Sequence, residues 1–282
     1  GKQAIIGKKG NKIWDEDNYK GKFTYKFDDS KTLSLGYMKT KNEYTYDYRS
    51  HERWIDNGTY NLTGSTAKKS EYFSVSDKSF DAAPGGVDER IYTIGYADKD
   101  AGLHVNAGLT DNRSWNGGVY SGGTSKTDLS KYNSKRYTMG VTKEVQLSNN
   151  DYAVFGLQYQ HDKMDKVKLK SSDFKTISQG KTDMYGIFFQ DEHKFNDKVS
   201  LIGALRYDHW TVKDGHVYDV NGMDDKPDSR SDSALSPKLA LNYKFDDTQS
   251  AYVSWGRAFS APSLYDMFSG TVNGKIAGSV QS

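Results

Sequence analysis

Side chains suited to binding a small molecule gather in two polar stretches, Glu43–Asp88 and Asp111–Lys131. Both stretches combine arginine with tryptophan and tyrosine. A guanidinium group pairs with anions and stacks on rings, and an aromatic side chain offers a flat apolar surface, so the combination predicts binding of an anionic, aromatic ligand. The alternative is that these side chains pack within loops or at a membrane interface. The candidate ligand-binding residues are Arg49, His51, Arg53, Trp54, Arg113, Trp115 and Tyr120.

Catalytic and metal-binding patterns are poorly represented. Asp191, Glu192 and His193 are consecutive, and successive residues of a strand point to opposite faces, so these groups do not converge. The acidic segment Asp219–Asp225 resembles a calcium loop, but its glycine comes early and an arginine stands where the bidentate glutamate belongs. We interpret this segment as a solvated loop, with calcium binding as the alternative. The chain has no cysteine, which excludes a disulfide, a thiolate zinc site and a thiol nucleophile. No Ser-His or paired-carboxylate constellation stands out either, so we predict no catalytic residue, no metal site, no cofactor and no enzymatic activity.

The composition limits the class of fold that can position these residues. Of the 282 residues, 35% are hydrophobic, and no long apolar run is present, which excludes a membrane-spanning helix. The net charge of only +2 gives no basic excess for a phosphate backbone, so we predict no nucleic-acid partner. A transmembrane β-strand is compatible with this composition, because it needs an apolar residue only at every second position.

Hydrophobic residues recur with a period of two, which is typical of β-strands. From Asn18 to Phe27 one face carries mainly tyrosine and phenylalanine, while the other carries mainly lysine. The turn Asp28–Ser30 and a second alternating run complete a hairpin, and four similar hairpins follow along the chain. The short connections within hairpins alternate strictly with long polar stretches between them.

This alternation of connection lengths separates two kinds of antiparallel β protein. Outer-membrane barrels have short periplasmic turns and long extracellular loops, whereas each loop of a soluble sandwich is set by its local crossing. The run from Asn18 to Phe27 also has the length of about 9–11 residues that a tilted membrane strand needs. We predict an all-β fold, an antiparallel transmembrane β-barrel with an up-and-down meander. A soluble two-layer sheet is the alternative.

The alternation also assigns the two faces of the sheet. Lipid cannot solvate Lys20, Lys22 or Lys26, so their face is expected to line a wet or protein-filled lumen. The other face then meets lipid, and its aromatic side chains suit the girdles at the membrane interfaces. The aromatic residues assigned to this surface are Tyr19, Tyr25, Tyr37, Tyr207, Tyr243 and Trp255.

Two regions in the second half of the chain carry recognisable motifs. Met184–Asp208 contains a strand ending in Gln-Asp, a short turn and the pattern Gly-x-x-Arg-Tyr-Asp. Leu235–Phe245 contains Ser-Pro-Lys, and Ala251–Phe268 contains Gly-x-x-Phe-x-Ala-Pro-x-Leu. The motif residues are Gly203, Arg206, Tyr207, Asp208, Gly256, Arg257, Phe259, Ala261 and Pro262. In these motifs the chain resembles the barrel of the TonB-dependent outer-membrane receptors.

The resemblance implies a receptor in the bacterial outer membrane that captures a scarce, bulky nutrient and imports it with energy from TonB. A ferric siderophore is the usual cargo, and haem or cobalamin are alternatives; His51 or His216 could then ligate haem iron. The expected partners are TonB, reached through an N-terminal plug, an iron complex or similar small molecule, and outer-membrane lipid. We expect residues 1–282 to be an interior part of one barrel domain, roughly ten or eleven strands, with the plug and the C-terminal strands outside this chain.

The motif residues are assigned structural roles. Arg206 and Asp208 face inward in the membrane zone, where unpaired charge is costly, so we expect them to pair with each other, with wall charges or with the plug. The box from Gly256 to Pro262 is assigned to strand exit and loop placement. Two other classes of function stay open at this point, a passive porin or adhesin barrel and an outer-membrane enzyme such as a lipase or protease barrel.

Overall fold

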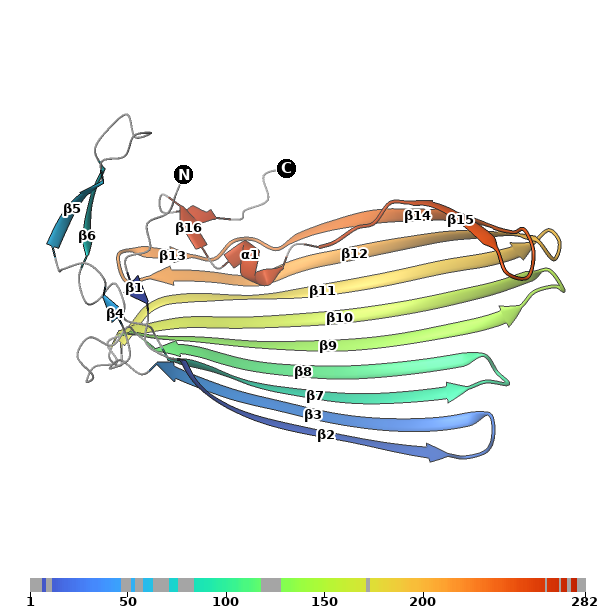
Figure 1. Cartoon of the computed structure of the whole chain (residues 1–282), viewed down its shortest axis with the longest axis horizontal. Coiled ribbons are helices and arrows are strands. Elements are labelled where there is room, and N and C mark those ends of the chain that lie inside the picture. The colour runs from blue at the N-terminus through green and yellow to red at the C-terminus, as the bar shows by residue number, and fades with distance from the viewer. Residues whose placement is uncertain are drawn as a thin grey trace.

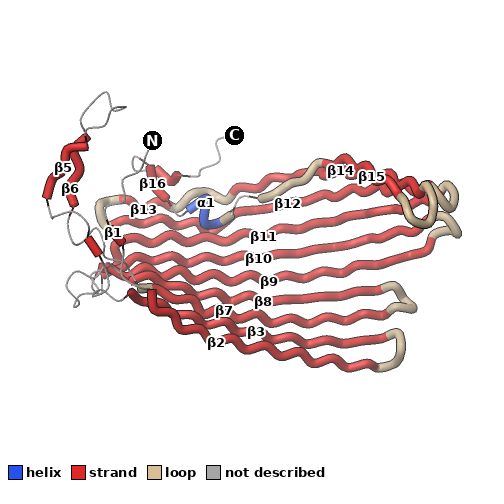
Figure 2. The backbone as a smooth tube through the Cα atoms, viewed as in Figure 1, coloured by secondary structure: helices blue, strands red, loops and turns tan. Residues whose placement is uncertain are grey.

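One antiparallel sheet makes up most of the described structure (Figures 1 and 2). The computed structural model describes residues 7–8, 12–46, 52–53, 58–62, 71–75, 84–117, 128–170, 173–261, 263–268, 270–272 and 275–277. The strands of the main sheet are β2 (Lys12–Lys26), β3 (Lys31–Tyr46), β7 (Gly85–Asp98), β8 (Leu103–Gly117), β9 (Asp128–Gln146), β10 (Asp151–Lys170), β11 (Asp173–Lys194), β12 (Val199–Asp219), β13 (Met223–Asp225), β14 (Arg230–Lys244) and β15 (Ser250–Gly256).

The order of strands in this sheet is β15-β14-β12-β11-β10-β9-β8-β7-β3-β2, with β13 paired to β12 beside this path. Three separate pairs are β1 (Gly7–Lys8) with β4 (Glu52–Arg53), β5 (Gly58–Leu62) with β6 (Glu71–Val75), and β16 (Gly270–Val272) with β17 (Lys275–Ala277). In the described part of the chain β2 and β15 are the two edges and do not pair with each other, so the sheet is open. The predicted all-β antiparallel meander is confirmed.

Short turns join the hairpin strands at one end of the sheet, on the right in Figure 1. In the first turn, Asp28 Oδ1 accepts hydrogen bonds from the backbone amides of Ser30 (2.9 Å) and Lys31 (2.7 Å). Asp246 does the same for Thr248 and Gln249 in the last turn. A carboxylate that accepts local amides stabilises the turn backbone, which explains why Asp marks both reversals.

At the other end, the strands extend farther than the sequence pattern indicates. The polar stretch Asp162–Gln179, predicted to be a loop, consists largely of the ends of β10 and β11. Likewise β8 continues to Gly117 and β12 to Asp219. Beyond the apolar zone neither face needs apolar residues, so the period-two signal disappears although the backbone ladder continues.

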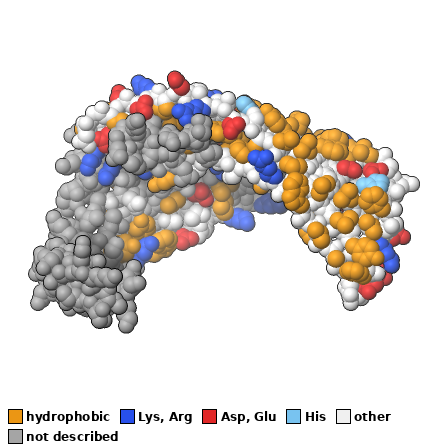
Figure 3. Space-filling view, turned by 90° about the horizontal axis from the view of Figure 1, so that it is seen from above, with side chains coloured by type: hydrophobic (Ala, Val, Ile, Leu, Met, Phe, Trp, Pro, Cys, Tyr) orange, Lys and Arg blue, Asp and Glu red, His pale blue; other side chains and the backbone are white. Residues whose placement is uncertain are grey.

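The two faces of the sheet differ as predicted. We call the face with exposed apolar side chains the outer face; its register line Leu33, Tyr96, Val105, Val141, Leu157, Ile187, Tyr207 and Leu235 crosses eight strands. All six aromatic residues assigned to lipid are exposed, from Tyr37 at 38% to Trp255 at 62%. In space-filling view the wall is bent, and hydrophobic side chains gather toward the turn end (Figure 3). Within the described residues, no helix has the length and apolarity to cross a membrane.

A small buried core lies on the opposite, inner face, where the chain after β15 returns to the wall. There the short helix α1 (Leu264–Phe268) contacts β10, β11 and β12. Its side chains join Met164, Trp210, Val212 and Val217 in one cluster. The Phe268 ring fits beside Gly180 and Gly215, where an added Cβ would lie 2.5 and 2.9 Å from the ring. The two glycines thus create the notch that holds α1.

Candidate ligand-binding site

A cavity of about 510 Å³ opens on the inner face beside α1. Strands β7 to β12 form one wall, and Ala261, Ser263, Leu264 and Tyr265 form the other. Its volume lies within the range of about 300–1,000 Å³ that is typical of small-molecule sites. Its walls carry both polar and apolar side chains.

Arg136 and Asp162 form the polar wall. The Arg136 Nε and Nη2 atoms donate to the two Asp162 carboxylate oxygens at 2.7 and 3.2 Å. Gln160 Nε2 also donates to Asp162 Oδ2, at 2.8 Å, so the carboxylate is held from two sides. In the part of the chain that the structure describes, no hydrogen bond uses Arg136 Nη1. This edge of the guanidinium is therefore oriented and available to an anionic acceptor.

Aromatic rings come from both walls, Tyr132 from β9 and Tyr265 from α1. Tyr132 and Tyr265 meet edge to face at 5.9 Å, and Lys166 Nζ lies 4.7 Å from the centre of the Tyr265 ring. Trp210 is 8% exposed, and its indole N–H is buried without a hydrogen-bond partner among the described residues. A buried donor without a partner costs free energy, and the Trp210 residue that carries it lines the cavity. Together the walls suit a ligand that combines anionic oxygens with flat apolar parts.

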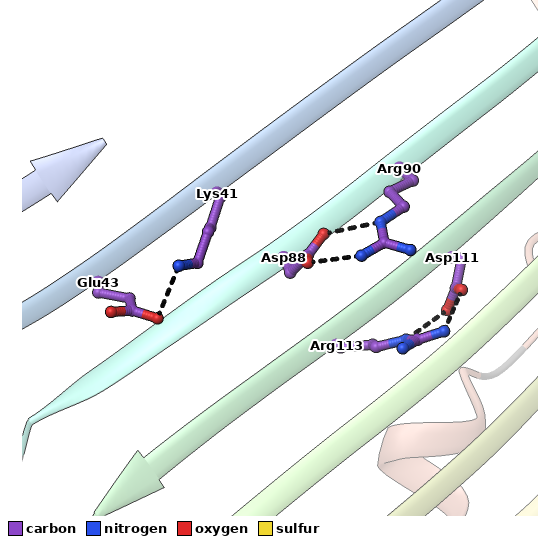
Figure 4. Close-up of polar contacts among 6 residues, drawn as sticks. All are labelled: Lys41, Glu43, Asp88, Arg90, Asp111 and Arg113. Atoms are coloured by element: carbon purple, nitrogen blue, oxygen red, sulfur yellow. Dashed lines mark hydrogen bonds and ion pairs between the residues drawn. The ribbon is translucent and has the colours of Figure 1, made fainter. Parts of the chain in front are cut away.

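The sequence-predicted binding residues that the structure describes lie elsewhere. Arg113 and Trp115 belong to the C-terminal half of β8, on the outer face. Arg113 Nη2 lies 2.9 Å from Asp111 Oδ2 (Figure 4). The backbone of Arg53 belongs to β4, and its side chain is outside the described residues. Also outside lie Arg49, His51, Trp54 and Tyr120. Their contact with ligand stays a prediction.

Arg136, Gln160 and Trp210 were not among the sequence-predicted candidates. A signal for them exists in the alternation, because Arg136 precedes the outward Tyr137 and is therefore inward. The two Gln160 neighbours, Tyr159 and His161, likewise pair with outer-face residues. The sequence-predicted candidates lie in the long polar stretches, whereas the cavity is lined mainly by residues of the strands.

The motif residues hold the wall together. Arg206 donates to Asp208 through Nε at 2.8 Å and Nη2 at 2.6 Å, so the predicted pairing is confirmed. Arg206 Nη1 also donates to Gln158 Oε1 at 2.7 Å. On the adjacent strand, Gly186 leaves room for this guanidinium, because a Cβ there would collide with Arg206. Phe259 and Ala261 of the second motif pack against the α1 cluster, and Pro262 lies outside the described residues.

The other candidate sites are ordinary parts of strands and turns. Asp191, Glu192 and His193 lie consecutively on β11, pairing with Ala153, Tyr152 and Asp151 of β10. His216 belongs to β12, and its Nε2 lies 2.8 Å from Asp224 Oδ1. Among the described residues, no group of three His, Asp or Glu side chains is arranged to hold a metal ion.

Comparison with known proteins agrees with this architecture. Residues 6–281 match the family model described as TonB dependent receptor-like, beta-barrel. The FrpB iron transporter from Neisseria meningitidis superposes with a TM-score of 0.63 at 17% identity, over 90% of this chain and 37% of that one. The copper transporter OprC superposes with a TM-score of 0.66 at 15% identity, over 98% of this chain and 42% of that one. The ferric citrate transporter FecA superposes with a TM-score of 0.58 at 12% identity, over 88% of this chain and 36% of that one.

These structural similarities show the fold. The chain spans about two fifths of the length of the solved structures that it matches. No curated protein matches the chain.

Proposed function

Because the chain belongs to the family of TonB-dependent receptor-like β-barrels, we propose that it acts in an outer-membrane receptor for energy-coupled uptake of a scarce, bulky nutrient. Proteins of this family are transport receptors located in the bacterial outer membrane, rather than enzymes. The proposed partners are TonB, acting through an N-terminal plug, the small-molecule cargo, and outer-membrane lipid. The proposed cargo is a ferric siderophore, and haem and cobalamin are the alternatives within the family.

The observation that carries the cargo class is the mixed wall of the inner cavity. Arg136 presents a free guanidinium edge, while Tyr132 on the same strand and Tyr265 on the returning segment supply aromatic rings. Ferric siderophores combine anionic oxygen atoms with aromatic or apolar groups, so they match both walls. Iron and copper transporters are among the similar structures, which also favours a metal complex as the proposed cargo.

The test is binding of chemically distinct cargoes to the intact receptor. Isothermal titration with a ferric catecholate, a ferric hydroxamate, ferric citrate, haemin and cyanocobalamin identifies the class. Arg136→Gln should then weaken the bound cargo by about 10- to 100-fold, because a hydrogen bond to a charged group contributes about 1.5–3 kcal/mol.

Arg90→Gln is the matched control, since it removes the same charge, also paired with an aspartate, from the outer face of β7. Unchanged affinity in Arg136→Gln, or an equal loss in Arg90→Gln, would place the site outside this cavity. Uptake that continues in cells lacking TonB would refute energy coupling and favour a passive porin.

A further inference from the structure

The outer face changes from aromatic to basic within one register step. One line across the sheet contains Tyr37, Tyr92, Leu109, Tyr137 and His161. The next line, two residues farther along each strand from the turns, contains Lys39, Arg90, Asp111, Lys135, Lys163, Lys181 and Lys213. Six of these seven side chains are cations.

Four adjacent strands, β9 to β12, each contribute a lysine to this line. We call Lys135, Lys163, Lys181 and Lys213 the lysine row; each is the direct register partner of the next. Directly opposed side chains on neighbouring strands have Cβ atoms about 5 Å apart, and like charges in such pairs destabilise a sheet. An uninterrupted row of four lysines therefore calls for anions.

The carboxylates of the chain compensate this row only in part. Lys163 contacts Asp165 at 3.2 Å, Lys181 contacts Asp214 at 2.7 Å and Lys213 contacts Asp183 at 2.5 Å. The Lys163 and Lys181 side chains are 46% and 36% exposed, so their pairs stabilise weakly, whereas Lys213 is held more firmly because Asp183 is only 9% exposed. Among the described residues Lys135, which is exposed, forms no ion pair.

We call the lysine row and the charged outer-face residues at the same level of β3, β7 and β8 the charged band. On β3, β7 and β8 the cations of this band pair with carboxylates of the chain itself. Figure 4 shows three pairs along these strands, Lys41 with Glu43 at 3.2 Å, Arg90 with Asp88 at 2.9 Å and Arg113 with Asp111 at 2.9 Å. Opposite charges also face each other across strands there, as in the register partners Lys41, Asp88 and Arg113. The contrast makes the lysine row, and not the whole band, the unusual feature.

The depth of the row identifies the anion. Aromatic girdles mark the membrane interface, and Tyr137 is the outer-face residue next to Lys135 on β9. Two strand residues at a tilt near 45° place the ammonium groups roughly 5 Å beyond that ring, where lipid phosphates lie. The bounds of β9 to β12 place the row nearer the end of the sheet opposite the short turns, which is the extracellular side in this family.

We propose that the lysine row binds phosphate groups of the phosphorylated glycolipid in the outer leaflet of the membrane. This inference rests on the proposed location in the outer membrane, and it does not depend on the cargo. Each ammonium group has three donors and a compact charge, which suits contact with phosphate oxygens from several directions. Bound lipid then supplies the negative charge that the wall itself lacks.

The test compares two triple variants of the full-length receptor purified in detergent. Lys135→Gln with Lys163→Gln and Lys181→Gln removes three charges from the row. Lys99→Gln with Lys198→Gln and Lys244→Gln removes three exposed lysines at the turn end as a matched control. Native mass spectrometry with added bis-phosphorylated lipid A, and with phosphatidylcholine as the zwitterionic probe, measures binding.

We expect the row variant to bind lipid A at least about tenfold more weakly, the control to bind normally, and neither to change with phosphatidylcholine. The triple Lys→Arg variant should retain binding, and the single Lys135→Gln variant should show a smaller loss if the triple variant folds poorly. Equal lipid A binding in the row variant and the wild type, or an equal loss in the control, overturns the proposal. Cargo affinity measured on the same samples separates this outcome from failure of the proposed function.

Discussion

The notch that holds α1 gives a sharp prediction through Gly180→Ala. A Cβ at Gly180 would lie 2.5 Å from Phe268 Cε2 and 3.3 Å from Leu264 Cδ2, whereas ordinary contacts begin near 3.4 Å. The ring must therefore move by about 0.9 Å or α1 must leave the wall. Overpacking of this kind typically costs about 1–3 kcal/mol, which lowers the docking equilibrium of α1 by about 5- to 150-fold.

The effect is measurable because α1 has no stability of its own. A helix of five residues is far below the length of about 12–15 that is marginally stable in water, so its amides are protected only while it is docked. Hydrogen exchange of the Met267 amide, which donates to the Ser263 carbonyl at 3.1 Å, should accelerate by the same factor in the intact receptor.

Gly21→Ala is the control for this experiment. Gly21 lies in β2 with no atom within 4 Å of an added Cβ, so the same substitution should leave α1 unchanged. Wild-type exchange at Met267 in Gly180→Ala, or equal acceleration in Gly21→Ala, would refute the notch as the support of α1.

Two further predictions concern buried charge and the turns. Arg206→Gln leaves Asp208, which is 4% exposed, without its bidentate partner, so it should lower the free energy of unfolding in urea by about 3 kcal/mol. Adding Asp208→Asn should restore part of this loss, because the unpaired buried charge is then removed. A loss that the second substitution does not reduce would contradict the prediction. In the first turn, hydrogen bonds from the Ser30 hydroxyl and amide and from Lys31 hold the pKa of Asp28 below its ordinary value of 3.8. A carboxyl group with a lower pKa in the folded chain stabilises the fold above its unfolded pKa, and this contribution disappears as pH falls through the folded pKa. Asp28→Asn should therefore flatten the acid side of the stability profile between about pH 2 and pH 5, and a profile parallel to that of the wild type would show that the turn does not contribute.

Much of the architecture could be predicted from local pattern. The alternation from Asn18 to Phe27 gives the two faces of β2, and the Asp28 turn gives the direction of its partner. The pairing of Arg206 with Asp208 follows because opposite charges two residues apart on a strand lie next to each other on the same face. These features depend on neighbours within a few residues, where backbone geometry leaves few choices.

Other features depend on which residues of different strands are brought opposite each other. Alternation indicates that Arg136 points inward, but only the folded chain places Tyr265 and Trp210 around the same cavity, with α1 returning from beyond β15. The position of the lysine row likewise depends on the register between strands. Its successive members are 18 to 32 residues apart in the sequence and become neighbours only through strand pairing. The sequence alone determined the faces and the meander, because side-chain direction has a period of two along any strand. The tertiary structure decided the cavity and the lysine row, because register and the return path of the chain are set by packing across the whole sheet.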